Sequence, residues 1–261
     1  NFVVKAGKEV SETALKLIDD IIKLLAKGAK AIEEFLQNIW KKIAEWFQEN
    51  RKVVTLVNKV DNNLILLVKT LRQNPMYLDS LEYIKLIGRP LGRWVALEQE
   101  AAINLYSRSY YILFNKALRK LQGVKLTREF KAMQKILDDA LDKLPAFEQK
   151  GQPLFRSTFF EEKDIKKLFK VGKDFVDQGF FSTTYSEKAL YNWMRTNTTD
   201  NVIIKVYGKN GKLIQESSTL PGEAEVLFKS GTTFIVDNVN KGARHPLDRT
   251  RKITEIILKE K

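Results

Sequence analysis

A globular composition over 261 residues is enough for a catalytic domain and an additional segment, and no run of about 18 apolar residues is present that could span a bilayer. The absence of cysteine excludes disulfides, thiolate metal sites and a cysteine nucleophile, and the single histidine leaves little for a histidine metal centre or a Ser-His-Asp triad. The net charge of +13 favours anionic partners, whether nucleic acid, membrane or acidic protein.

The first predicted element is a long helix within residues 11–49. Its apolar residues recur at alternating spacings of four and three, a heptad-like stripe that is typical of a helix packed against another helix. Residues 53–72 carry a second apolar stripe, so a helical hairpin is predicted over residues 1–72. Because Trp46 and Phe47 widen the apolar face, the alternative is an amphipathic helix that contacts a membrane.

Residues 73–261 are predicted to form a second domain of the α+β class. Three amphipathic segments predict a helical part over residues 75–145, and these segments are 77–87, 94–121 and 127–144. Short apolar runs bounded by turns predict a β-rich part over residues 151–261, with strands at 153–159, 179–183, 202–207, 223–228, 232–239 and 253–258. Because the helices precede the strands without regular alternation, a mainly antiparallel sheet is expected.

Two glutamates one residue apart, Glu223 and Glu225, open the predicted strand 223–228. In a strand their side chains would share a face about 6 to 7 Å apart, and repulsion would raise the pKa of at least one of them. Such a pair can hold an acid and a base near neutral pH. A solvated strand face is the competing interpretation of this pair taken alone.

Two more motifs precede the glutamates, each on or beside a predicted strand. They are Phe155-Arg156-Ser157 and Phe181-Ser182-Thr183-Thr184. Together with Glu223-Ala224-Glu225, they resemble the Arg, Ser-Thr-Ser, Glu-x-Glu class of mono-ADP-ribosyltransferases, which includes bacterial toxins and effectors. Segments 101–106 and 114–119 are similar to the helical region that precedes the arginine strand in that family, and segment 140–145 is similar to its approach into that strand. The resemblance covers about residues 75–261 and implies an ADP-ribosyltransferase-like fold.

The resemblance implies NAD as a co-substrate and no metal. Arg156 would clamp the phosphates, because a guanidinium keeps its charge and binds phosphate with two hydrogen bonds. Glu225 would bind a ribose hydroxyl and stabilise the positive charge that develops on the ribose, with Ser182 holding it in place. Glu223 would orient or deprotonate the acceptor. The other residues expected to contact the dinucleotide are Ser157, Phe181, Thr183 and Thr184.

A glutamate at position 223 is associated in this family with arginine acceptors, so the expected activity is transfer of ADP-ribose from NAD to protein arginine. The resemblance further implies a secreted or delivered bacterial effector that acts in the cytoplasm of a target cell, together with a cognate immunity protein. NAD hydrolysis and transfer to nucleic acid are the alternatives within the fold. A non-catalytic helical module that binds a membrane or a partner is the alternative of another class.

Two loops complete the sequence predictions. Residues 217–222 correspond to the acceptor-recognition loop of the family, and they lack the aromatic residue that many protein-modifying members carry there. His245 lies in a Gly-Ala-Arg-His-Pro segment, and this composition predicts an exposed loop histidine without a catalytic role.

Overall fold

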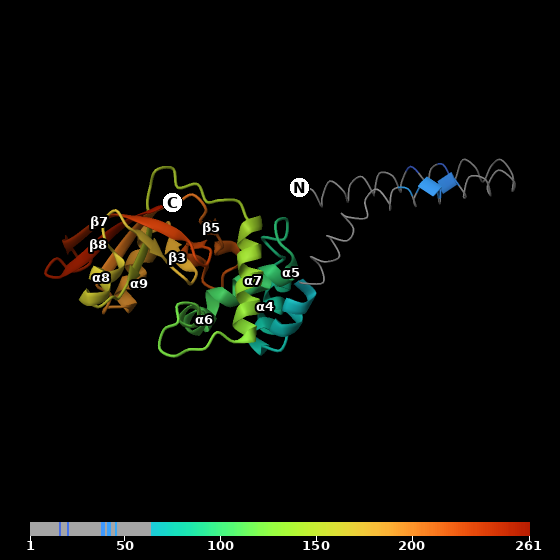
Figure 1. The fold of residues 1–261 in the computed structure, drawn as a ribbon, viewed down its shortest axis with the longest axis horizontal. Coiled ribbons are helices and arrows are strands. Elements are labelled where there is room, and N and C mark those ends of the chain that lie inside the picture. The colour runs from blue at the N-terminus through green and yellow to red at the C-terminus, as the bar shows by residue number, and fades with distance from the viewer. Residues whose placement is uncertain (1–15, 17–19, 21–37, 40, 43–44, 46–63) are drawn as a thin grey trace. The chain divides into compact units, whose positions relative to one another are not determined.

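The structure is a computed structural model that describes residues 16, 20, 38–39, 41–42, 45 and 64–261 (Figure 1). The chain divides into two compact units, Asn1–Leu66 and Leu67–Lys261. The predicted hairpin and its membrane-contacting alternative lie outside the described residues, apart from isolated helical positions and a helical segment at 64–71. The predicted domain boundary at residues 72 and 73 therefore stays a prediction. No described helix is both long enough and apolar enough to cross a membrane.

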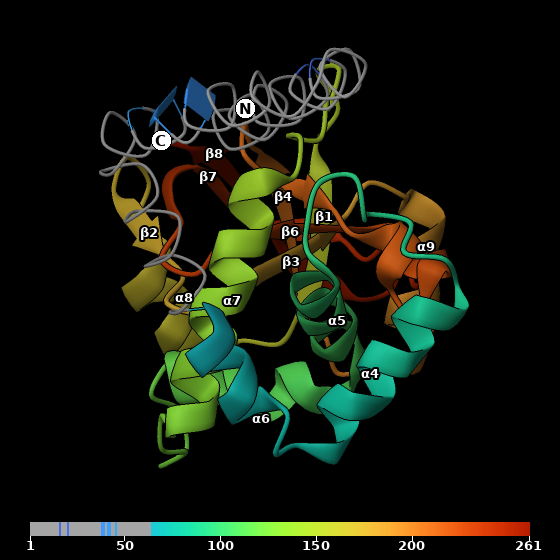
Figure 2. The same cartoon turned by 90° about the vertical axis from the view of Figure 1, so that its right-hand side faces the viewer.

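The helical part of the second unit begins with α4 (Pro75–Leu86) and α5 (Leu97–Leu105). The Asn74 side chain caps α4 by accepting a hydrogen bond from the backbone N–H of Met76, and proline occupies the first position of the helix, where its missing N–H is tolerated. α5 packs against α4 and against α7 (Arg128–Lys143), as Figure 2 shows. α7 buries one apolar face and is capped by Thr127, so the predicted helix 127–144 is confirmed.

The predicted helix 94–121 is interrupted in the structure. After α5 the chain forms a π-helical segment, η1 (Tyr106–Tyr110), before α6 (Tyr111–Leu118). Within η1 the backbone of Arg108 leaves the helical region, with φ −87° and ψ −171°. Such π segments occur frequently at functional sites.

In the described part of the chain, eight strands form one sheet in the order β2-β7-β8-β4-β1-β3-β6-β5. The pairs are antiparallel except for β4 with β8, so the predicted α+β class and the mainly antiparallel sheet are confirmed. The strands are β1 (Leu154–Thr158), β2 (Asp174–Val176), β3 (Phe181–Thr184), β4 (Val202–Tyr207), β5 (Lys212–Leu213), β6 (Glu225–Phe228), β7 (Thr233–Arg244) and β8 (Lys252–Glu260). Two helices lie between strands, α8 (Glu162–Leu168) and α9 (Glu187–Thr196).

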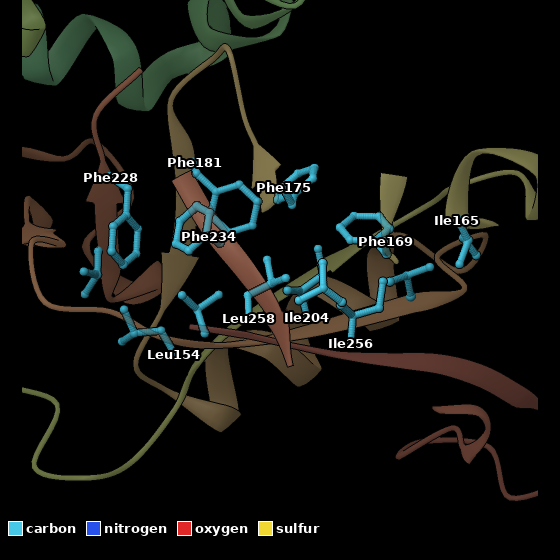
Figure 3. Packing of buried hydrophobic residues seen from close by; sticks show 14 residues of the cluster. Leu154, Ile165, Phe169, Phe175, Phe181, Ile204, Phe228, Phe234, Ile256 and Leu258 are labelled. Carbon is cyan, nitrogen blue, oxygen red and sulfur yellow. The ribbon is translucent and has the colours of Figure 1, made fainter. Parts of the chain in front are cut away.

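Phenylalanines form the centre of the sheet's core (Figure 3). The ring of Phe181 packs on Phe234 with centroids 5.2 Å apart, and Phe228 meets Phe234 edge to face at 5.5 Å. These rings are at most 2% exposed. A second apolar cluster joins β1 to α9 through Phe155, Leu190 and Met194. The two clusters fix the strands that carry the candidate site.

His245 is buried, so the prediction of an exposed loop histidine is wrong. Its side chain is 5% exposed, and its Nδ1 accepts a hydrogen bond from the backbone N–H of Leu247. The backbone N–H of His245 donates to the carbonyl of Arg251, which closes the connection between β7 and β8. The connection thus buries a side chain that the composition of the segment predicts to be exposed.

Candidate active site

Glu225 is the first residue of β6, and its side chain is 6% exposed. β6 pairs with β3 in a register that sets Thr184 opposite Glu225. The Ser182 side chain forms a hydrogen bond with the Glu225 carboxylate. Burial raises the pKa of Glu225 to about 7, while the hydrogen bond from Ser182 opposes the shift and the charge of Glu223 adds to it. Glu225 therefore changes its protonation state near neutral pH.

Glu223 does not belong to the strand, so the predicted shared strand face of the two glutamates is wrong. Pro221–Glu223 forms a 3₁₀ turn, and Ala224 has a left-handed backbone with φ 50° and ψ 47°. The carbonyl of Ala224 accepts hydrogen bonds from the Thr184 hydroxyl at 3.3 Å and from the backbone N–H of Tyr185 at 3.4 Å, and these bonds support this unusual conformation. Glu223 is half-buried, and burial raises its pKa. Burial, and not repulsion between the two carboxylates, is thus the main cause of the raised pKa of each.

Arg156 projects from β1 toward the same site. Its Nη1 donates a hydrogen bond of 2.8 Å to the carbonyl of Ser182, and its guanidinium lies 5.2 Å from the centre of the Phe181 ring. Partial burial lowers the pKa of Arg156, and the positive charge of Arg119 lowers it further. Among the described residues, no carboxylate lies within ion-pair distance of this guanidinium. The site thus contains a cation without a bound counter-charge.

The structure gives other predicted site residues a packing role. Phe181 is 2% exposed and belongs to the core, where its ring supports Arg156. Thr183 is buried and donates to the carbonyl of Val226 at 2.7 Å. Ser157 lies on the opposite face of β1 from Arg156, and its Oγ has no hydrogen-bond partner in the part of the chain that the structure describes.

The structure therefore brings four predicted residues together: Arg156, Ser182, Glu223 and Glu225. Thr184 borders this group, because its hydroxyl donates to the carbonyl of Ala224 and accepts from the backbone N–H of Ser186. Contacts of these residues with a dinucleotide stay a prediction.

Tyr111 is a site residue that the sequence prediction missed. It is the first residue of α6, directly after the π-helical segment. Burial raises the pKa of its hydroxyl, as do the charges of Glu223 and Glu225, while the charge of Arg156 lowers it. Tyr111 is therefore close enough to the three charged residues of the site for their charges to act on its hydroxyl. In the sequence it is one of many aromatic residues in an amphipathic segment, and no motif distinguishes it.

A hydrogen-bond network from α6 holds the loop that leads into β3. Arg119 forms two bonds with Asp177, from Nε at 2.7 Å and from Nη2 at 2.9 Å, and also donates to the carbonyl of Phe180. Asn115 accepts from the backbone N–H of Phe180 at 2.9 Å. Gly179 has no room for a side chain, because a Cβ there would lie 2.7 Å from the Asn115 amide oxygen. The network sets the position at which β3 presents Ser182.

Two further observations concern the described residues: a cavity away from this site and the lack of a metal-binding cluster. A cavity of about 310 Å³ lies at the opposite end of β6, where Phe228 and Lys229 contribute to its lining. No group of three or more histidine, aspartate or glutamate side chains in residues 64–261 is arranged to hold a metal ion.

Comparison with known proteins identifies the family of this arrangement. The family model of the ADP-ribosyltransferase exoenzymes matches residues 69–261. The chain belongs to this family. The motif-based prediction of a mono-ADP-ribosyltransferase is therefore confirmed. Among curated protein sequences, none matches the chain at a significant level.

Several solved structures share the exoenzyme fold. Exoenzyme S from Pseudomonas aeruginosa, solved with human 14-3-3 protein beta and bound to Carba-NAD, is 22% identical over 76% of this chain and 88% of its own, with a TM-score of 0.58. The type III effector XopAI from Xanthomonas axonopodis pv. citri is 19% identical over 77% of this chain and 83% of its own, with a TM-score of 0.58. Plx2a, an ADP-ribosyltransferase toxin from Paenibacillus larvae, is 18% identical over 71% of this chain and 96% of its own, with a TM-score of 0.52. At these identities the likeness is one of fold.

Proposed function

We propose that this exoenzyme transfers ADP-ribose from NAD to an arginine side chain of a target protein and releases nicotinamide. One observation carries the proposal. The buried carboxylate of Glu225 and the unpaired guanidinium of Arg156 lie in one site without forming an ion pair. Such an arrangement suits a substrate that has anionic groups at one end and a centre of developing positive charge at the other.

The residues present fit NAD. The Arg156 guanidinium has five N–H donors, and the hydrogen bond to Ser182 uses a single Nη1 donor, so others are available for phosphate oxygens. The Glu225 carboxylate can accept a hydrogen bond from a ribose hydroxyl, in addition to the bond from Ser182. NAD supplies the ADP-ribosyl group together with nicotinamide as its leaving group.

Each glutamate has a separate task in the proposed reaction. As the bond to nicotinamide breaks and its electron pair leaves with nicotinamide, the ionised Glu225 stabilises positive charge on the ribose. An acceptor guanidine nitrogen forms the new bond to the same carbon, and its proton passes to Glu223. Burial raises the pKa of Glu223, which strengthens it as a base. Ser182 keeps the Glu225 carboxylate oriented through its hydrogen bond.

An arginine acceptor fits the position of Glu223. This half-buried carboxylate ends the turn Pro221–Glu223, and Leu220, directly before the turn, is 52% exposed. A carboxylate is the natural partner of a guanidinium, because two parallel N–H···O bonds can form between them. The similarity to the type III effector XopAI supports the further proposal that this enzyme acts inside a target cell after delivery. The cognate immunity protein stays a prediction.

The test compares three variants with the wild-type protein, using labelled NAD with agmatine, a small guanidine, and with cell lysates. Glu225→Gln is expected to reduce both NAD hydrolysis and transfer by at least about 10²-fold. Glu223→Gln is expected to reduce transfer by about 10²-fold or more and to leave hydrolysis largely intact. Glu216→Gln is the matched control, since this exposed glutamate lies in the same loop, and it is expected to change neither rate.

Equal rates in all four proteins would refute the proposal. Label in RNA or DNA would replace the protein acceptor by nucleic acid. Release of free ADP-ribose with neither agmatine nor protein labelled would identify a hydrolase.

A further inference from the structure

The loop that carries Glu223 is anchored to α5 as well as to the strands beside it. We call residues 214–224 the acceptor loop. Its 3₁₀ turn η2 (Gln215–Ser217) packs on α5. The Asn104 side chain donates a hydrogen bond of 2.7 Å to the carbonyl of Ser217, and the Ser217 hydroxyl donates one of 2.8 Å to the Glu100 carboxylate. These three residues are fully buried.

The anchor extends along the loop toward its exposed tip. The backbone N–H of Thr219 donates to the Ser107 hydroxyl at 3.2 Å, and that hydroxyl donates to the carbonyl of Asn104 at 2.8 Å. Beyond Thr219 the chain reaches Leu220 and then the turn that ends in Glu223. Glu223 thus follows, within a few residues, a segment that contacts both α5 and η1.

Packing alone does not favour a glutamate at the buried position 100. Its Oε1 accepts hydrogen bonds from the Ser217 hydroxyl and from the backbone N–H of Leu91, both at 2.8 Å. Its Oε2 faces the Nε of Arg89 at 3.8 Å, and neither atom has a hydrogen-bond partner among the residues the structure describes. A buried carboxylate with an oxygen that lacks a hydrogen-bond partner destabilises the fold relative to an apolar side chain of similar size. Its contribution is to fix two separate backbone segments at one point.

We propose that Glu100 is a positioning residue that fixes the acceptor loop through Ser217 and so holds Glu223 beside Glu225. This inference rests on the proposed function. Glu225 and Ser182 are held by the pairing of β6 with β3, which involves neither Ser217 nor Glu100. Weakening the anchor should therefore impair transfer to an acceptor and leave cleavage of the bond to nicotinamide intact.

The direct test is Ser217→Ala, which removes the hydroxyl donor and keeps the backbone carbonyl that Asn104 binds. We expect the kcat/KM for transfer to agmatine to fall about tenfold or more, because small displacements of a reacting group have large effects on rate. NAD hydrolysis should stay within about twofold of wild type. Ser230→Ala is the matched control, because Ser230 makes the same kind of bond, 2.8 Å to Asp138 of α7, at the opposite end of β6. Both rates should be unchanged in this variant.

Amide hydrogen exchange of residues 214–224 tests the anchor independently of catalysis. Ser217→Ala and Glu100→Gln should both speed exchange in this segment, and Ser230→Ala should not. Unchanged exchange in the first two variants would overturn the inference, as would a parallel fall of transfer and hydrolysis in Ser217→Ala. If the wild-type protein turns over no NAD, the proposed function fails, whereas the exchange experiment still decides whether Glu100 anchors the loop.

Discussion

Glu225 links the chemistry of the site to the stability of the fold. Burial raises the pKa of Glu225 from 4.5 to about 7, so between these pH values the folded protein binds a proton that the unfolded chain releases. The free energy of unfolding therefore falls as the pH rises through this window. Above pH 7 the ionised carboxylate is expected to cost on the order of 3 kcal/mol.

This linkage gives a prediction for Glu225→Gln. The amide keeps the shape of the side chain and can still accept the hydrogen bond from Ser182, but it carries no charge. At pH 8 the variant should melt about 5 °C or more above the wild type, and at pH 4 the two should melt together. Thermal unfolding at both pH values, with Glu216→Gln as an exposed control, checks this. An equal shift at pH 4 and pH 8 would show that ionisation of Glu225 is not the cause.

At the residue scale, the motifs predict which chemical groups form the site, but they do not predict how the structure arranges those groups. Arg156, Ser182 and the two glutamates were predicted as site residues because their functional groups are visible in the sequence. The left-handed backbone conformation of Ala224 was not predicted, because it is supported by a hydrogen bond from the Thr184 hydroxyl, which lies 40 residues earlier in the sequence. The pKa of Glu225 likewise depends on burial by segments that are distant in the sequence, and the Glu-x-Glu motif does not reveal this burial.

At the element scale, amphipathic spacing predicts the helices and strands that bury a continuous face. β4 matches its predicted bounds, and α7 differs by one residue at each end. β2 and β5 were missed, because strands of three and two residues are too short for a periodic pattern and exist through their pairing with β7 and β6. The π-helical segment was also missed, because it changes the hydrogen bonding of the helix without changing its composition.

The contact between α6 and the loop before β3 gives a prediction at this scale. Asp177→Asn removes the charge that Arg119 binds and leaves a largely buried cation without its counter-charge. We expect the free energy of unfolding to fall by about 3 kcal/mol. Asp139→Asn is the control, because its pair with Lys135 is exposed and should contribute less than about 1 kcal/mol. Urea unfolding of the two variants measures the difference, and equal losses would contradict a special role for the buried pair.

At the scale of the whole molecule, the second unit has its own core, and its first residues belong to that core. Ile65 is 64% exposed, whereas Val68 is 8% exposed and Leu71 is fully buried. A second unit that began after the predicted boundary at residue 72 would therefore lack two of its core side chains. A boundary at residue 66 would retain them.

Two truncations test where the catalytic unit begins. Removal of residues 1–66 should leave the melting temperature of the remaining unit and its NAD turnover unchanged. Removal of residues 1–72 should lower the free energy of unfolding by about 3 kcal/mol or more, because the contacts of Val68 and Leu71 are lost. Thermal unfolding and turnover of the two truncated chains provide the measurement. If both truncations behave like the full chain, the core does not require residues 67–72.

The place of β8 in the sheet has a consequence for the order of events during synthesis. This strand spans Lys252–Glu260, yet it lies between β7 and β4 and pairs with both, and its Ile256 and Leu258 are fully buried. A ribosome releases these residues after every other strand has emerged. Until then, β4 and β7 have no common neighbour, and the apolar surface between them stays open to water. The catalytic sheet can therefore close only after β8, the last of its strands, has been synthesised.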